Sequence, residues 1–305
     1  MYRFIILLIS AFVPVVALQA QSAIALNGLT RSTELPTTAV TPHTPKVTES
    51  PFYVKVSGFY GLLTPGVRIN YSEAVVASGS AQPFKTTSKG LGGGARGGIG
   101  VGLILSDFIN IGVDAEVLFG APIKIDIGFE DGVAKSTTTA TTTLNVVSVI
   151  PNITFKALSR PTYYIYNRLG LVGGMVLQYK TVNSYVDRFS SGSVQTKEST
   201  NEYTKNSLAL GYQAALGIQF RLSQRIRAFA EVVAYNQSFK PKRLEYTPAA
   251  TTAGAASVQV TEYIDQGVEV PNTNPTTRKP QTGQQQSFTV PMNSIGVGAG
   301  ITFRF

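Results

Sequence analysis

Residues 208–221 read LALGYQAALGIQFR, and this stretch decides the fold. Every even-numbered position from Leu208 to Phe220 is apolar or aromatic, whereas the odd-numbered positions are small or polar and end at Arg221. Successive side chains of an extended strand point to opposite faces, so a period of two indicates a β-strand with one apolar and one polar face. The stretch is also longer than the roughly five or six residues usual for strands of soluble sheets.

The same period recurs along the chain from residue 51. We find eight such segments, which lie around residues 52–62, 91–105, 109–119, 144–157, 163–179, 208–221, 226–235 and 295–305. Repeated alternation of this kind predicts an all-β chain.

The connections between these segments alternate in length. Short turns are expected near Ser106, Pro161 and Gln224. Four long loops are expected between the other neighbouring segments, at 64–88, 121–143, 180–206 and 240–288. Short turns at one end and long loops at the other are typical of an up-and-down membrane barrel. The sequence therefore predicts that residues 51–305 form an eight-stranded antiparallel up-and-down transmembrane β-barrel with four long external loops.

Periodicity alone does not say which face of the strands is the inside. A soluble barrel encloses its apolar side chains, whereas a membrane barrel turns them to lipid and lines its lumen with polar residues. Three features favour the membrane barrel: strands long enough for a tilted span, glycines on the polar face, and aromatic residues at strand ends. The low charged fraction, 14% of residues against about 25% in typical soluble proteins, agrees with a lipid-facing surface.

The N-terminal residues carry a targeting pattern. Residues 1–20, MYRFIILLISAFVPVVALQA, place Arg3 before an apolar run and end in a small-residue cleavage site, which predicts a cleaved signal peptide. A membrane anchor is the alternative, but the run is shorter than the ~20 residues that a helical span requires. Residues 21–50 are polar and rich in Thr and Pro, and we expect a disordered periplasmic linker there.

Charged residues on the polar faces predict a balanced lumen. Asp114 and Glu116 share one face of their strand, and pairing about a turn at residue 106 would set Arg96 opposite Glu116. Because a desolvated charge needs a partner, we interpret Arg96–Glu116 as a buried ion pair, with a catalytic carboxylate pair as the alternative. The predicted lumen ion-pair network consists of Lys55, Arg96, Asp114, Glu116, Arg168 and Glu231.

The chain has a formal net charge of +9, and much of the excess lies near the short turns. We predict a periplasmic basic rim that consists of Lys156, Arg160, Arg221, Arg225, Arg227 and Arg304. Such a rim is able to contact phospholipid phosphates of the inner leaflet, and simple solvation of the turns is an equal alternative. Because the long loops and the linker are nearly neutral, a nucleic-acid partner is not expected.

Few chemistries are open to this composition. The chain has no Cys and one His, His43, which lies in the predicted linker, so thiolate, multi-histidine and Ser/His/Asp sites are excluded from the barrel. The glycine-rich residues 90–102 contain the spacing of a dinucleotide-binding loop, but no alternation of strands and helices surrounds them. The run of Thr at 137–143 is expected to be a solvated loop edge. We therefore predict no enzymatic activity, no cofactor and no metal site.

The C-terminal strand carries a family resemblance. The chain ends in ITFRF, which resembles the assembly signal of Gram-negative outer-membrane barrels, with Phe303 and Phe305 as its aromatic residues. Residues 211–235, GYQAALGIQFRLSQRIRAFAEVVAY, resemble a strand–turn–strand unit of small OmpA/OmpX/OmpW-like barrels, especially those of the Bacteroidetes-type outer membrane β-barrel family.

This resemblance implies a location in the cell outer membrane, with membrane lipid, lipopolysaccharide and the barrel-assembly machinery as partners. The enzymes known in that membrane generally rely on a His inside the barrel, which this sequence lacks. The leading interpretation is a structural or surface-interaction barrel that acts through its external loops, above all the 240–288 loop and its surface partner. A narrow channel for small or hydrophobic solutes is the alternative.

Overall fold

The structure of the protein is a computed structural model that describes residues 51–305 except 66, 73–83, 131–133, 250–256 and 269–280. The predicted signal peptide and linker, residues 1–50, lie outside the described residues. The described part of the chain is all-β and contains sixteen strands. Within it, no helix is long and apolar enough to cross a membrane.

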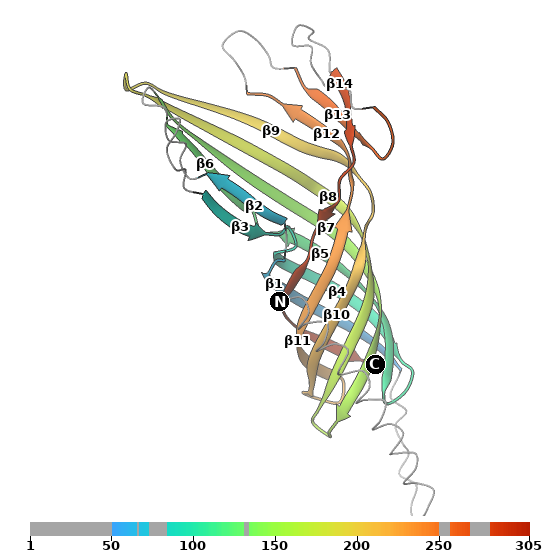
Figure 1. The fold of residues 1–305 in the computed structure, drawn as a ribbon. Helices are drawn as coiled ribbons and strands as arrows, with labels where there is room; N and C mark the ends of the chain where they lie inside the picture. The colour runs from blue at the N-terminus through green and yellow to red at the C-terminus, as the bar shows by residue number, and fades with distance from the viewer. Residues whose placement is uncertain (1–50, 66, 73–83, 131–133, 250–256, 269–280) are drawn as a thin grey trace, which may run out of the picture. The chain divides into compact units, whose positions relative to one another are not determined.

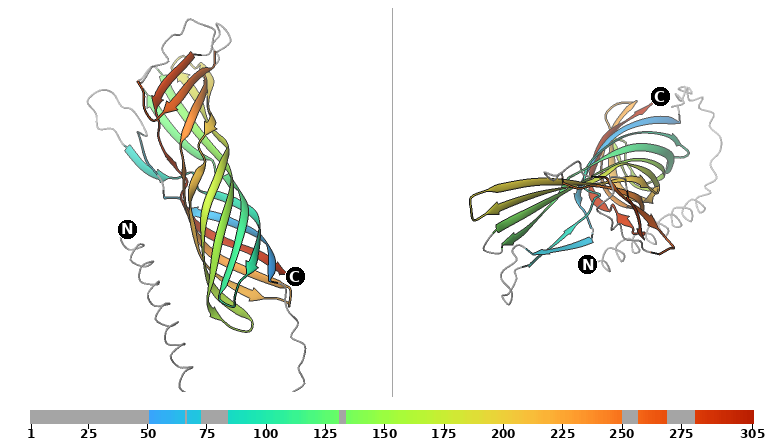
Figure 2. Two further views of the ribbon diagram at one scale, coloured as in Figure 1. Left: turned by 90° about the vertical axis from the view of Figure 1, so that its right-hand side faces the viewer. Right: turned by 90° about the horizontal axis from the view of Figure 1, so that it is seen from above.

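Eight of the strands pair in a ring. Their bounds are β1 (Phe52–Leu63), β4 (Gly94–Ile104), β5 (Ile109–Gly120), β7 (Ala134–Ser159), β8 (Tyr163–Phe189), β10 (Ala209–Arg221), β11 (Ile226–Phe239) and β16 (Ser294–Arg304). Each is antiparallel to the next in this order, and β16 pairs with β1, so the pairings return to the strand at which they begin. Figures 1 and 2 show these strands winding about a common axis, with the short turns at one end. We call them the strand ring.

The four long connections, which were predicted as external loops, contain further strands. β2 (Val67–Ser72) and β3 (Phe84–Lys89) form a separate hairpin. The others join the ring strands in one fourteen-stranded sheet. They are β6 (Ile123–Glu130), β9 (Val194–Asn206), β12 (Pro241–Thr247), β13 (Gln259–Ile264), β14 (Gln281–Gln286) and β15 (Val290–Pro291).

The length of β7 and β8 explains these additional strands. The two remain paired far beyond the ring, out to Ala134 opposite Phe189, and β6 and β9 pair along their other edges. The threonine run at 137–143 lies inside β7 and not at a loop edge, because β-branched residues favour extended strands. The hydroxyls of Thr142 and Thr181 also lie within hydrogen-bond distance across the pair, at 2.9 Å. We call β6, β9, β12, β13, β14 and the parts of β7 and β8 beyond the ring the strand extension.

The strand ring turns its apolar side chains outward. Ile99, Leu171 and Leu210 are 64%, 70% and 61% exposed, whereas Arg96 and Gln213 on the opposite face are 3% and 1% exposed. A soluble barrel has the opposite distribution, with its apolar side chains inside. The ring therefore has the inverted arrangement typical of a barrel that contacts lipid.

Glycines on the inner face provide room for long side chains. A Cβ atom at Gly100 would collide with the Asp114 carboxylate and approach Lys55 Cε to 3.2 Å. Gly97 points outward from the same strand and has open space around it, with nothing within 4 Å of an added Cβ. The packing inside the ring thus requires glycine at position 100 and not at position 97.

We predict that Gly100→Ala lowers the free energy of unfolding by about 1–3 kcal/mol, since a methyl group added to a filled interior displaces its neighbours. Gly97→Ala is the matched control, and it should be neutral or stabilising by up to about 1 kcal/mol because alanine loses less backbone freedom than glycine. Urea unfolding of both variants in detergent micelles measures the two values. Equal stability of the variants would contradict a packed interior.

Candidate functional site

Four charged side chains from every second strand of the ring meet inside it. Arg168 of β8 donates to Asp114 of β5 (Nη1–Oδ2 2.6 Å) and to Glu231 of β11 (Nη2–Oε1 2.5 Å). Lys55 of β1 donates to the same Asp114 oxygen at 2.5 Å, and Tyr166 donates its hydroxyl to Glu231 Oε2 at 2.9 Å. None of the four charged residues is more than 8% exposed. We call Lys55, Asp114, Arg168 and Glu231 the ion layer.

The two other residues of the predicted network, Arg96 and Glu116, are also buried, but they do not hydrogen-bond to each other. The Arg96 guanidinium lies over the Tyr235 ring, 4.1 Å from its centre, and Tyr235 donates its hydroxyl to Glu116 Oε2 at 2.7 Å. No side-chain nitrogen of Arg96 has a hydrogen-bond partner among the described residues. A cation–π contact through Tyr235 thus stands in place of the predicted direct ion pair.

The register of β4 and β5 explains this correction. The structure pairs Arg96 with Leu118, two residues beyond the predicted partner Glu116. The turn is centred on residue 107 and not on 106, because the Ser106 hydroxyl accepts hydrogen bonds from the amides of residues 108 and 109 and holds a longer turn. A shift of two residues leaves each side chain on its face, so both charges still point inward.

An apolar cluster fills the ring at the end away from the short turns. Its buried members are Leu118, Leu144, Val146, Tyr179, Ala209, Phe239, Val290 and Met292. Phe239 and Met292 are at most 2% exposed. Sequence reasoning missed this cluster because it treated the inward positions as polar. The sequence did contain a sign of this cluster. Phe239 lies on the same face of β11 as Glu231 and Tyr235, so it was expected to point inward.

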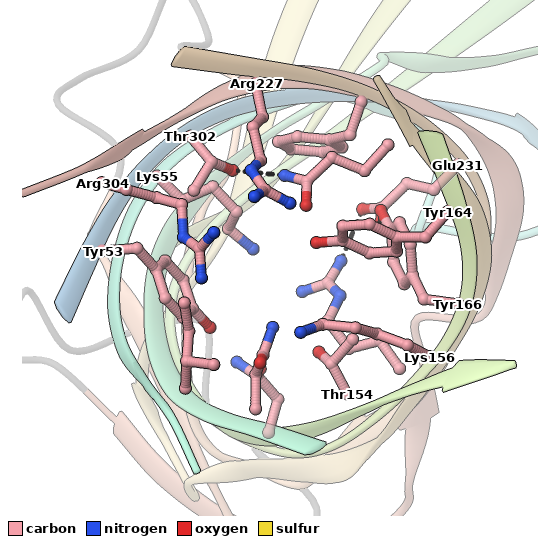
Figure 3. Close-up of a pocket in the computed structure, with 16 residues that line it drawn as sticks. Tyr53, Lys55, Thr154, Lys156, Tyr164, Tyr166, Arg227, Glu231, Thr302 and Arg304 are labelled. Atoms are coloured by element: carbon pink, nitrogen blue, oxygen red, sulfur yellow. Dashed lines mark hydrogen bonds and ion pairs between the residues drawn. The ribbon is translucent and has the colours of Figure 1, made fainter. Parts of the chain in front are cut away.

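A cavity of about 550 Å³, its open mouth included, lies on the short-turn side of the ion layer (Figure 3). The structure divides the predicted basic rim around this cavity. Three of the six cations, Lys156, Arg227 and Arg304, line the cavity and are half-buried. The other three, Arg160, Arg221 and Arg225, are exposed at or beside the short turns. The rim therefore does not form one outward-facing collar, since half of its cations line the lumen.

The two predicted assembly residues lie on the outer face of β16 and just after it. Phe303 is 39% exposed and Phe305 is 66% exposed. This placement leaves both rings accessible to lipid or to another protein, and their role in assembly stays a prediction.

The carboxylates inside the ring are engaged with partners. Asp114, one of the pair considered for acid–base chemistry, accepts from Lys55 and Arg168, and Glu116 accepts from Tyr235. Their separate partners argue against a shared proton between them. Within the described ranges, no three His, Cys, Asp or Glu side chains gather in a way that would hold a metal ion.

No protein-family model matches the chain, and no curated protein matches it. One weakly similar solved structure is an anion-selective porin from Comamonas acidovorans, at 10% identity and a TM-score of 0.12, over 83% of this chain and 100% of that one. Another is a FadL homologue from Pseudomonas aeruginosa, at 7% identity and a TM-score of 0.15, over 83% of this chain and 89% of that one. Scores this low do not assign a function to the chain.

We predict that Arg168→Met lowers the free energy of unfolding by about 3–5 kcal/mol, because it leaves two buried carboxylates without their shared partner. Arg96→Met is the matched control. Its guanidinium has no hydrogen-bond partner among the described residues, so we expect a loss of about 1–2 kcal/mol from the cation–π contact alone. Denaturant unfolding in micelles measures both, and a larger loss for Arg96→Met than for Arg168→Met would contradict the ion layer.

Proposed function

We propose that the protein is an eight-stranded transmembrane β-barrel of the cell outer membrane, which has a closed lumen and acts through the strand extension outside the cell. The outward apolar surface supports the membrane location. One side chain at least 50% exposed comes from each of seven ring strands: Val56, Ile99, Val149, Leu169, Leu216, Val232 and Val297. Several lie side by side on paired strands, such as Val56 with Ile99 and Leu216 with Val232. An apolar surface of this extent needs lipid to cover it.

The filling of the inside of the ring by side chains is the observation that supports the proposal. The ion layer, the Arg96–Tyr235 contact and the apolar cluster follow one another along the inside of the ring. Eight strands make a barrel just wide enough for its own side chains to fill. A solute that crossed would have to separate Arg168 from two carboxylates in a buried site, which is costly. These layers favour a structural or surface-interaction role over transport.

The strand extension is joined to the apolar cluster by aromatic rings. Tyr179 of the cluster stacks on Tyr203 of β9 with 4.2 Å between ring centres, and Tyr203 in turn lies 6.4 Å from both Tyr263 and Phe288. Burial raises the pKa of Tyr203 to about 12, so its hydroxyl stays neutral at physiological pH. This continuity favours an ordered surface outside the membrane.

The 240–288 connection is the proposed contact surface for a partner. Its described ends are tied together by Asp265, which accepts hydrogen bonds from Lys240 at 2.9 Å and from Ser287 at 2.5 Å. These two bonds hold the pKa of the Asp265 carboxyl below its usual range. β14 is the last strand in the order of its sheet, so one edge of its backbone has no neighbouring strand among the described residues. Such an edge suits strand addition by a surface protein, and lipopolysaccharide is the other proposed partner.

The proposed orientation follows from the ends of the ring. The described N-terminal and C-terminal strands, β1 and β16, begin and end at the short turns, and the strand extension lies at the other end (Figure 1). The short turns would then face the periplasm. Phe303 and Phe305 would meet the barrel-assembly machinery from that side, as the resemblance of the C-terminal strand implies.

A narrow channel for small or hydrophobic solutes is the second candidate, and the cavity favours it. The lumen contains a cavity on the short-turn side of the ion layer. A channel would require the apolar cluster and the ion layer to move apart together.

We predict that the purified protein gives no stable, salt-dependent openings in planar bilayers, because the ion layer, the Arg96–Tyr235 contact and the apolar cluster all fill the lumen. Phe239→Ala combined with Met292→Ala loosens only the apolar cluster, so this variant should also stay silent. Heat-modifiable gel migration of the same proteoliposomes shows that each protein is folded. Openings of wild-type protein whose conductance rises with salt would support the channel and contradict the closed lumen.

We also predict that replacing residues 248–287 with a short turn leaves assembly intact and lowers binding to lipopolysaccharide. The replacement keeps Pro241 and Val290, which are buried against the ring. Gel migration reports assembly, and titration of lipopolysaccharide into the refolded protein reports binding. If the variant fails to assemble, the connection is structural and the proposed contact role is wrong.

A further inference from the structure

Arg96 of β4 brings a buried guanidinium into the inside of the strand ring. The residue is 3% exposed, and its Nε, Nη1 and Nη2 atoms have no hydrogen-bond partner among the described residues. The Tyr235 ring attracts the positive charge, but a ring face offers none of the oxygen lone pairs that the N–H groups of a guanidinium bind. Buried donors of a charged group are costly without acceptors, so an acceptor is expected beside Arg96.

A small second cavity lies beside this guanidinium. The residues that line it with polar side chains are Ser57 of β1, Arg96 of β4, Glu116 of β5, and Glu231 and Tyr235 of β11. The space has room for about one water molecule. The cavity thus brings the unsatisfied donors of Arg96 together with carboxylate and hydroxyl oxygens, and it is too small for a larger ligand.

Two small residues, Ser57 and Gly98, leave this space open. They are paired across β1 and β4. A Cβ atom at Gly98 would lie 2.6 Å from Glu116 Cγ and 2.7 Å from the Ala115 carbonyl oxygen, so position 98 requires glycine. Ser57 shares the parity of the buried Lys55 and therefore points inward. A larger side chain at position 57 would enter the cavity.

The balance of buried charges requires a neutral occupant. Three cations and three carboxylates are buried among the described residues, namely Lys55, Arg96, Arg168, Asp114, Glu116 and Glu231. An added anion or cation would leave one buried charge without a counterpart, which is costly. An apolar occupant would leave the donors of Arg96 unsatisfied. The occupant that satisfies both conditions is small, neutral and polar.

Water fits the remaining hydrogen-bond capacity of the lining. Glu116 Oε2 accepts a hydrogen bond from the Tyr235 hydroxyl at 2.7 Å. A carboxylate accepts up to about four hydrogen bonds, so Glu116 retains capacity for a further donor. The Ser57 hydroxyl is able to donate or accept. A buried water makes about three hydrogen bonds to groups of this kind.

We infer that one water molecule occupies this cavity, where it accepts a hydrogen bond from Arg96 and donates one to Glu116. The direct ion pair predicted from the sequence is then replaced by a contact through water. Because Glu231 of the ion layer lines the same cavity, the water joins the ion layer to Arg96 in one polar network. The site does not depend on the proposed function, since a closed lumen and a narrow channel would both contain it.

A high-resolution crystal structure of the protein in detergent tests the site directly. We expect one ordered water within about 3.2 Å of both an Arg96 nitrogen and a Glu116 oxygen. A dry cavity, density too large for water, or an Arg96 side chain bonded directly to Glu116 would each overturn the inference. Ser57→Ala is the matched control, because it removes a hydroxyl and keeps the space. The water should remain in this variant, and its loss would show that Arg96 does not hold it.

Ser57→Val tests whether Arg96 depends on the water. The added methyl groups fill the cavity and displace the water, so the folding equilibrium constant from urea unfolding in micelles should fall at least about tenfold. In an Arg96→Met background, which lacks the donors, the same substitution should be neutral or stabilising. Equal losses in the two backgrounds would indicate crowding alone and would overturn the inference. Heat-modifiable gel migration shows that each variant is folded.

Discussion

Arg168 joins Asp114 on one wall of the strand ring to Glu231 on the opposite wall, and Lys55 shares the Asp114 carboxylate. A buried charge is tolerated where a partner of opposite charge and good geometry accompanies it. Once these charges are paired, the polar face of every second ring strand must point inward. The same constraint sends the alternate, apolar side chains outward, because side chains of a strand alternate between its two faces.

Other features of the structure follow from that choice of faces. Long polar side chains need room in a narrow ring, and glycines such as Gly100 provide it. The apolar outer face needs lipid. The inside needs filling, which the ion layer, Tyr235 and the apolar cluster provide at successive levels. Three further cations, Lys156, Arg227 and Arg304, line the inside at the short-turn end.

The sequence predicts which side chains point inward and which point outward, because this depends only on whether a position in the strand is odd or even. Alternation predicted the positions of the ring strands and the inward face of all six charged residues, which are buried. The sequence does not predict which inward-facing side chains contact one another, because these contacts depend on the register between paired strands. One longer turn at Ser106 moved Arg96 away from Glu116 and onto Tyr235.

The alternation of apolar and polar residues does not predict the remaining features. The apolar cluster uses inward positions such as Phe239 that a simple polar-lumen rule overlooks. β9 and β14 lie in Thr-rich and Gln-rich segments whose composition resembles loops, and they pair with the edges that β8 and β13 offer. The division of the basic rim also required coordinates, since Arg221 and Arg227 share inward parity but differ in burial at the strand ends.

The most direct test of the closed lumen uses the absence of Cys from the sequence. Thr154 and Ser148 both point inward from β7, on the two sides of the ion layer, and are 8% and 1% exposed. In the folded protein, a water-soluble thiol reagent should label Thr154→Cys, which lines the cavity, and leave Ser148→Cys unlabelled. Equal labelling rates at the two positions would show that the lumen is open past Arg168 and would contradict the account.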